Sequence, residues 1–164
     1  MPASLPEQIL RAIDDAGDLY YRLVLLAAPA GGGKTAALLA LAERPGFRYL
    51  NVNLELSRRL LELSARERSL AVPRLLGEIV AGDGHVALLD NIEILFDVSL
   101  KVDPLRLLQR LSRNRTVVAA WNGSVEGGYL TYAAPDHAEH RRYAARELLV
   151  LRPTCRTAPS GSRA

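Results

Sequence analysis

A glycine-rich segment between two apolar runs constrains this sequence more than any other feature. Residues 23–27, Leu-Val-Leu-Leu-Ala, have strand character, and residues 36–42 are mostly alanine and leucine, which are strong helix formers. Three consecutive glycines and the pair Lys34-Thr35 lie between them. The order strand, glycine-rich loop, Lys-Thr and helix predicts a phosphate-binding loop.

The residue types in this loop suit a phosphate chain with a metal ion. Glycines let the backbone curl so that its N–H groups point inward, and the start of the following helix adds a positive dipole end. Lys34 can reach terminal phosphates, and the Thr35 hydroxyl can ligate Mg²⁺. One position departs from the usual pattern, because Ala28 replaces the first glycine. The candidate nucleotide-binding residues are Ala28, Pro29, Ala30, Gly31, Gly32, Gly33, Lys34, Thr35 and Ala36.

A second signal is a buried strand that ends in an acidic residue. Residues 85–89 form a continuous apolar run, which is typical of a strand covered on both faces, and Asp90 follows directly. An apolar strand closing in aspartate is the Walker B pattern, and it becomes specific downstream of a Lys-Thr loop. Asp90 is therefore predicted to hold Mg²⁺ through water or together with Thr35.

A third signal lies at the end of the next predicted strand, residues 115–120. Asn122 follows this strand, in a position that resembles the one where P-loop ATPases carry a sensor of the terminal phosphate. A simple turn asparagine before Gly123 explains the residue equally well. All three signals fall at carboxyl ends of strands, where open α/β sheets bind their ligands.

The remaining chain alternates between helical and strand patterns. Helices are predicted over residues 4–16, 36–42, 54–63, 73–80, 104–113 and 136–143, and strands over 23–27, 47–53, 85–89, 115–120 and 148–151. Residues 64–70 are expected to turn or fray, and Pro73 to open a helix. Residues 97–102 are expected to be a loop, and 124–134 a loop or short hairpin. This alternation predicts an α/β fold with three layers and a mainly parallel five-stranded sheet.

Size and composition are those of one globular domain. The chain has 164 residues, 49% hydrophobic and 24% charged. We expect a nucleotide-binding domain over residues 1–151 and a disordered tail over 152–164, which is rich in Pro, Ser, Thr and Gly. No apolar run is long enough for a bilayer, no signal peptide is visible, and a lone cysteine favours a reducing cytoplasm.

The charge balance permits nucleic-acid contact without demanding it. The formal net charge is +3, and only Lys34 and Lys101 are lysines among 21 basic residues. A general preference for arginine explains this bias. With so few lysines, one at the phosphate-contacting position favours a point-charge role for Lys34, which a guanidinium fills less well.

Two tyrosines precede the first predicted strand. Tyr20 and Tyr21 lie in an approach segment that packs beside the base in many nucleotide-binding domains. Either ring could stack on adenine, and packing at the rim of the fold is the alternative interpretation.

The order of these elements resembles the AAA+ group of P-loop ATPases over residues 18–151, without the helical lid that follows the family core. The resemblance implies a glutamate after Asp90, but this chain has Asn91, which can orient a water without accepting its proton. Glu93 is a possible substitute, so slow hydrolysis is expected. It also implies an arginine finger acting on a neighbouring subunit, for which Arg141 and Arg142 are the best placed.

Three phrases narrow the resemblance. They are NVNLELSRRLL at 51–61, LDNIEILF at 89–96 and LSRNRTVVAAWNG at 111–123. These phrases resemble the BrxF family, the small P-loop proteins of type III BREX bacteriophage-exclusion systems. The resemblance implies ATP and Mg²⁺ as cofactors, self-association or other BREX proteins as partners, and a role in antiphage defence.

Four functions remain open on the residues alone. The first is an ATP-hydrolysing module that assembles with itself or with larger partners. The second is a nucleotide-gated binding module with little turnover, which Asn91 favours. The third is a small-molecule kinase with an arginine-bearing lid at residues 58–68. The fourth is a nucleic-acid binder, whose affinity would fall steeply with salt.

Overall fold

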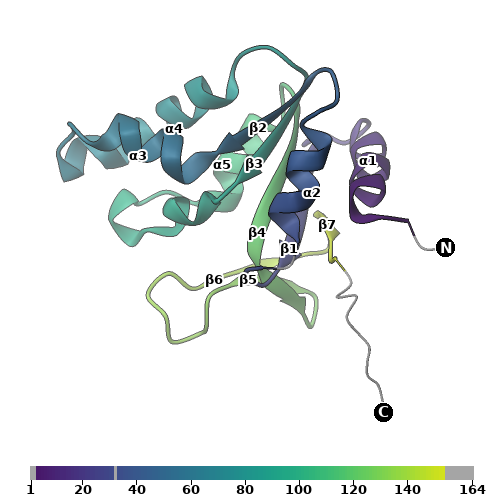
Figure 1. The fold of residues 1–164 in the computed structure, drawn as a ribbon. Coiled ribbons are helices and arrows are strands. Elements are labelled where there is room, and N and C mark those ends of the chain that lie inside the picture. Colours follow the sequence, from purple (N-terminus) through teal and green to yellow (C-terminus); the bar gives the residue numbers. More distant parts are fainter. Residues whose placement is uncertain (1–2, 32, 154–164) are drawn as a thin grey trace.

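The computed structural model describes residues 3–31 and 33–153 and shows an α/β fold (Figure 1). Its main sheet contains five strands in the order β2-β3-β4-β1-β7, and every neighbouring pair on this path is parallel. The strands are β1 Leu23–Ala28, β2 Phe47–Asn51, β3 Val86–Asp90, β4 Thr116–Glu126 and β7 Leu149–Leu151. The predicted α/β class and mainly parallel sheet are confirmed.

Helices cover both faces of this sheet. They are α1 Leu5–Ala16, α2 Lys34–Leu41, α3 Val52–Leu60, α4 Ala65–Val80 and α5 Pro104–Leu111. Side chains of α1 and α2 form one core cluster with Val24 and Leu26. Side chains of α3, α4 and α5 form the other cluster with Leu23 and Leu25. Figure 1 shows α1 and α2 on one side of the sheet and α3 and α4 on the other. Burial from both faces explains why β1 reads as a continuous apolar run.

Within the described ranges, no helix combines the length and the apolar character needed to cross a bilayer.

The first helix begins as its sequence predicts. Ser4 Oγ accepts from the Glu7 N–H, and the Glu7 carboxylate accepts from the Ser4 N–H, so both halves of a capping box are present.

Two helix starts differ from the prediction. Residues 65–80 form one helix, because Ser64 and Glu67 make a second capping box and Pro73 is accommodated inside it. The capping energy and the buried face of α4 outweigh the single backbone bond that a proline removes. Helix α3 begins at Val52, because the Asn51 side chain accepts from the Leu54 N–H and ends β2 there.

The end of β4 also differs. The sequence predicts that this strand ends at residue 120, with a turn at Asn122 as one alternative, but the strand continues to Glu126. It pairs there with an antiparallel strand, β5 Tyr129–Tyr132, so the short hairpin predicted within 124–134 is present. Gly123 permits this pairing, because a Cβ there would lie 1.9 Å from the backbone oxygen of Thr131.

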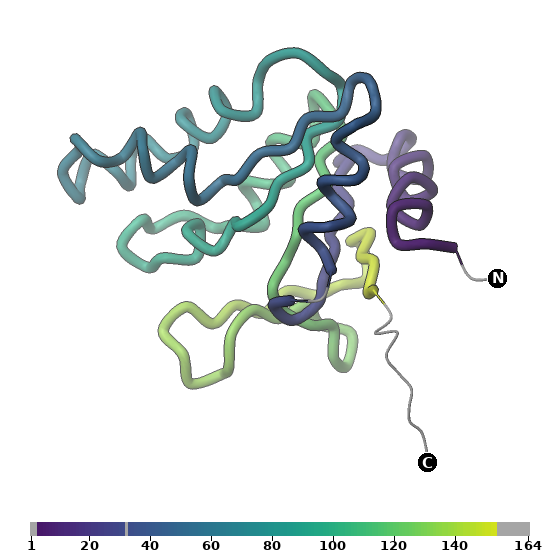
Figure 2. The backbone as a smooth tube through the Cα atoms, in the orientation of Figure 1, coloured from purple at the N-terminus to yellow at the C-terminus, as the bar shows by residue number. Residues whose placement is uncertain are grey.

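A further strand, β6 Arg141–Ala144, pairs with β5 where a short charged helix is predicted over 136–143. That helix prediction is wrong, because residues 141–144 form an edge strand with an alternating burial pattern. Figure 2 shows this antiparallel unit extending from the carboxyl end of β4.

Aromatic side chains fix the antiparallel unit to the main sheet. Trp121 is fully buried, and its Nε1 donates to the Thr131 oxygen at 3.0 Å. The Phe96 ring stacks on Tyr132 with 3.6 Å between centroids. Phe96 ends the short 3-10 helix η1, Ile92–Phe96. A second 3-10 helix, η2 Val98–Leu100, follows it within the segment 97–102, which is predicted to be a loop.

The predicted tail over 152–164 lies outside the described residues from position 154 onward, as does Gly32 of the loop. The absence of a helical lid after the core therefore stays a prediction. Residues 152 and 153 follow β7 without forming a helix or strand.

Candidate functional site

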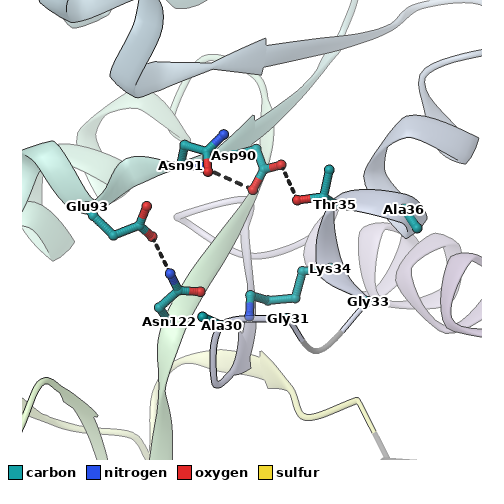
Figure 3. A pocket seen from close by; sticks show the side chains of 10 residues that line it. All are labelled: Ala30, Gly31, Gly33, Lys34, Thr35, Ala36, Asp90, Asn91, Glu93 and Asn122. Atoms are coloured by element: carbon teal, nitrogen blue, oxygen red, sulfur yellow. Dashed lines mark hydrogen bonds between the residues drawn. The ribbon is translucent and has the colours of Figure 1, made fainter.

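A pocket of about 210 Å³ lies at the carboxyl ends of β1 and β3 and beside Asn122, where the parallel pairing of β4 with β1 ends (Figure 3). It is lined by Ala30, Gly31, Gly33, Lys34, Thr35, Ala36, Asp90, Asn91, Glu93 and Asn122. All of these are candidate site residues of the sequence, so the three sequence signals meet in one pocket. Ala28 and Pro29 lie beside it, and Gly32 is outside the described residues.

The loop has a backbone that requires glycine for conformational reasons. Gly31 has φ 85° and Gly33 has φ 82°, both in the left-handed region, and a Cβ at either position would meet nothing within 4 Å. Backbone strain, not crowding, therefore selects glycine here. Gly33 is the N-cap of α2, so the helix begins at Lys34 and its first N–H groups lie at the pocket.

Lys34 is buried, with 5% of its surface exposed. Its Nζ donates to the backbone oxygens of Ala28 and Pro29, each at 2.7 Å. Burial lowers the pKa of Lys34, and the nearby carboxylates of Glu93 and Asp90 oppose this shift. The ammonium thus lies inside the curve of the loop, between its carbonyls and two acidic side chains.

Asp90 accepts three hydrogen bonds. Its Oδ2 accepts from the Thr35 hydroxyl at 2.6 Å and from the Tyr49 hydroxyl at 2.7 Å, and its Oδ1 accepts from the Asn91 N–H at 3.0 Å. The residue is 4% exposed. This set of donors satisfies a buried carboxylate and fixes its orientation.

Tyr49 is a site residue that the sequence analysis missed. Burial, together with its bond to Asp90, raises the pKa of Tyr49 to about 12, so its hydroxyl is a donor at neutral pH. The alternation along β2 places Tyr49 and Phe47 on the same face of the sheet, but it does not show which residues lie beside Tyr49. The register of β2 on β3, which pairs Asn51 with Asp90, brings the Tyr49 hydroxyl to Asp90.

Glu93 and Asn122 form the opposite wall of the pocket. Asn122 Nδ2 donates to Glu93 Oε2 at 2.8 Å. Burial is the main cause that raises the pKa of Glu93; the charge of Asp90 adds to it, and Lys34 opposes it. Asn91 has φ 54°, so the chain turns sharply after β3, and this turn brings Glu93 to the pocket.

The side-chain oxygens of Asp90 and Thr35 fit a magnesium ion as ligands. Mg²⁺ prefers hard oxygen ligands, and it usually takes one or two protein ligands together with substrate phosphates and water. The Thr35 hydroxyl and the Asp90 carboxylate supply such oxygens at one edge of the pocket. Among the described residues, no group of three or more His, Cys, Asp or Glu side chains forms an all-protein metal cage.

The candidate arginine fingers lie on β6, away from the pocket lining. Arg141 Nη2 donates to the backbone oxygen of Val102 at 3.0 Å. The Arg142 guanidinium lies over the Tyr129 ring at 3.5 Å from its centroid. Both side chains thus have partners within their own chain, and their action on a neighbouring subunit stays a prediction.

Other suggested residues lie elsewhere. Tyr20 and Tyr21 precede β1, so the six residues of that strand separate them from the loop, about 20 Å at the usual rise per residue. They do not line this pocket. In the segment 58–68, Arg59 bonds to Glu78, and Arg68 bonds to backbone oxygens at the end of α3, so these two arginines support helix packing.

No protein-family model matches the sequence, and no curated protein matches it. Among solved structures, the chain is similar to PCH-2 of C. elegans, with 15% sequence identity and a TM-score of 0.39. The match covers 82% of this chain and 38% of the PCH-2 chain, so this chain spans less than half of that protein. A similarity at this level does not assign a function.

Proposed function

We propose that this protein binds ATP with Mg²⁺ in the pocket at the carboxyl edge of its sheet, as a P-loop protein of the AAA+ type. The hydrogen bond from Thr35 to Asp90 carries the proposal, because it joins the glycine-rich loop to the acidic strand end. This contact, at 2.6 Å, brings the candidate phosphate-binding residues and the candidate metal-binding carboxylate to one place. The pocket volume, about 210 Å³, suits a phosphate chain better than a whole nucleotide.

Each side chain has a binding role in this proposal. The N–H groups at the start of α2 and of the loop donate to phosphate oxygens. Lys34 exchanges its two carbonyl partners for phosphate oxygens. Thr35 and Asp90 hold Mg²⁺, which when bound offsets the charge of the terminal phosphates.

We further propose that turnover is slow. Asn91 follows Asp90, and an amide orients a water without accepting its proton. Glu93 is the one acidic side chain in the pocket lining besides Asp90, and the bond from Asn122 fixes its carboxylate. In this scheme Glu93 accepts the proton as water attacks the terminal phosphorus and the bond to ADP breaks.

The two lysines of the chain provide a matched test. We expect Lys34→Met to weaken ATP binding by at least about 100-fold, since it removes a charged donor to phosphate. Lys101→Met, at an exposed position, is expected to bind like the wild type. Equal binding by both variants, or no binding by the wild-type protein, would contradict the proposal.

The alternative is a nucleotide-gated module without significant turnover, which Asn91 favours. Phosphate release by purified protein separates the two. Release that Glu93→Gln abolishes supports slow hydrolysis, whereas ATP binding without release supports the gate. Release that survives Lys34→Met comes from a contaminant.

The biological role is a separate proposal. The resemblance of residues 51–61, 89–96 and 111–123 to the BrxF family supports a role as an assembly or regulatory component of a BREX defence system. Its partners would be further copies of itself or other BREX proteins. Solution mass with and without ATP and Mg²⁺ tests self-association. Plating efficiency of phage on cells carrying the system with wild-type or Lys34→Met protein tests the defence role, and equal protection by both proteins would contradict that role.

A further inference from the structure

We infer that Tyr49 is a positioning residue for the metal-binding carboxylate, so that β2 supplies a third element to the site besides the loop and β3. The inference rests on the proposed function of the pocket. It concerns a residue that does not line the pocket and that no pattern in the sequence assigns to it.

The first observation is where Tyr49 lies. Its ring packs with the cluster that α1 and α2 form on one face of the sheet. Thr35 lies in the first turn of α2, on the same face. The two hydroxyls therefore reach the same carboxylate oxygen from one side, the Thr35 bond at 2.6 Å and the Tyr49 bond at 2.7 Å.

The second observation is how completely Asp90 is held. An ionised carboxylate offers about four lone-pair sites. Thr35 and Tyr49 use two on Oδ2, and the Asn91 N–H uses one on Oδ1. Without Tyr49, Oδ2 would accept from Thr35 alone, and the Thr35 hydroxyl is also a proposed Mg²⁺ ligand. When the Thr35 hydroxyl turns to Mg²⁺, the Tyr49 hydroxyl can still donate to Oδ2.

The third observation is that the segment directly after β2 supports the turn after Asp90. The Asn53 N–H, at the start of α3, donates to the Asn91 backbone oxygen at 3.0 Å. Tyr49 of β2 thus holds the carboxylate, and the start of α3 holds the peptide that follows it. The pairing of Asn51 with Asp90 sets both contacts at once.

Conservative variants test this role. Tyr49→Phe removes only the hydroxyl, and Tyr143→Phe is its matched control, because the Tyr143 hydroxyl donates to a different carboxylate, Asp103 Oδ1, at 2.9 Å. For each protein, the dissociation constant of ATP is measured in Mg²⁺ and in EDTA. The ratio of the two constants gives the gain in affinity that Mg²⁺ provides.

We expect Tyr49→Phe to reduce this gain by about 10-fold, as loss of a supporting hydrogen bond to a metal ligand does. Its ATP affinity in EDTA should stay within about 2-fold of the wild type, and Tyr143→Phe should keep the full gain. Unfolding temperatures of both variants show that each one folds.

An unchanged gain in Tyr49→Phe would overturn the inference, as would an equal loss in Tyr143→Phe. A wild-type protein that binds ATP equally with and without Mg²⁺ would also overturn it, while leaving nucleotide binding intact. A wild-type protein that binds no ATP in either condition would overturn the proposed function and this inference with it.

Discussion

Thr35 Oγ1 lies 2.6 Å from Asp90 Oδ2, although 55 positions separate the two residues in the chain. Asp90 ends β3, whereas Thr35 lies at the start of α2, which follows β1 and the loop. These two strands are not neighbours, because β4 lies between β1 and β3 in the sheet. The bond therefore joins elements on either side of β4, whose Asn122 contributes to the opposite wall of the pocket. Three strands that are far apart in sequence thus build one small polar site.

This relationship predicts different results for two substitutions at Thr35. Thr35→Ser keeps the hydroxyl, so we expect ATP affinity in Mg²⁺ to stay within about 3-fold of the wild type. Thr35→Val keeps the shape but leaves Asp90 with one donor fewer, and we expect a loss of at least about 10-fold. Calorimetric titration in Mg²⁺ and in EDTA measures both. A loss that is equally large in EDTA would show that Thr35 does not act through the metal.

Gly123→Ala should destabilise the fold. The added Cβ would lie 1.9 Å from the Thr131 oxygen and 2.8 Å from Trp121 Nε1, and neither atom can move without breaking the bond between them. We expect the free energy of unfolding to fall by about 2–3 kcal/mol, as overpacking typically costs. Urea denaturation followed by tryptophan fluorescence measures it, and an unchanged midpoint would contradict the pairing of β4 with β5.

Gly77→Ala should have the opposite effect. Gly77 lies inside α4, and a Cβ there would meet nothing within 4 Å. Because alanine is the stronger helix former, we expect the free energy of unfolding to rise by about 0.5–1 kcal/mol. The same denaturation experiment measures this gain. A decrease would mean that the helix does not continue through the segment after Pro73.

Glu93 predicts a pH-dependent stability difference. Burial raises its pKa in the folded protein above the ordinary value of 4.5. The charged form is therefore disfavoured by folding, and the wild-type protein loses stability as pH rises through the folded-state pKa. Glu93→Gln carries no such charge, while its side-chain oxygen can still accept from Asn122.

The unfolding temperature of Glu93→Gln minus that of the wild type should be smallest at pH 4 and should increase as the pH rises through the folded-state pKa of Glu93. Glu93→Gln also removes the attraction between Glu93 and Lys34, which makes this temperature difference smaller. The difference does not change sign, because burial has a larger effect on the Glu93 pKa than Lys34 does. Glu147→Gln, at an exposed position, serves as the control and should show no such trend. A difference that is constant with pH would contradict the burial of the Glu93 charge.

The sequence predicts the pocket well because its residues sit at strand ends. A buried parallel strand is visible as an apolar run, and the first polar residue marks where that run ends. Asp90 ends β3, and Asn122 ends the part of β4 that pairs with β1. Parallel strands then bring these residues to one edge whatever the strand order. Tyr49 lies inside a strand, so its contact depends on the register of β2 on β3, which the sequence does not display.

Errors in the predicted elements arise where local preference meets a tertiary or capping contact. Pro73 favours a helix start, but the Ser64 and Glu67 capping box begins α4 at Ala65, eight residues before that proline. Asn122-Gly123 favours a turn, but the small volume of glycine instead lets β5 approach β4 closely. The charged residues at 141–144 lie on an edge strand, where alternating exposure permits polar side chains.

Strand β4 belongs to two different pairings, parallel to β1 as far as Asn122 and antiparallel to β5 from Gly123 onward. The two pairings are consecutive, so no spare residue separates them to act as a joint. We therefore expect local unfolding of the antiparallel unit to loosen the backbone that carries Asn122, so that this pocket wall and the antiparallel unit open as one cooperative unit.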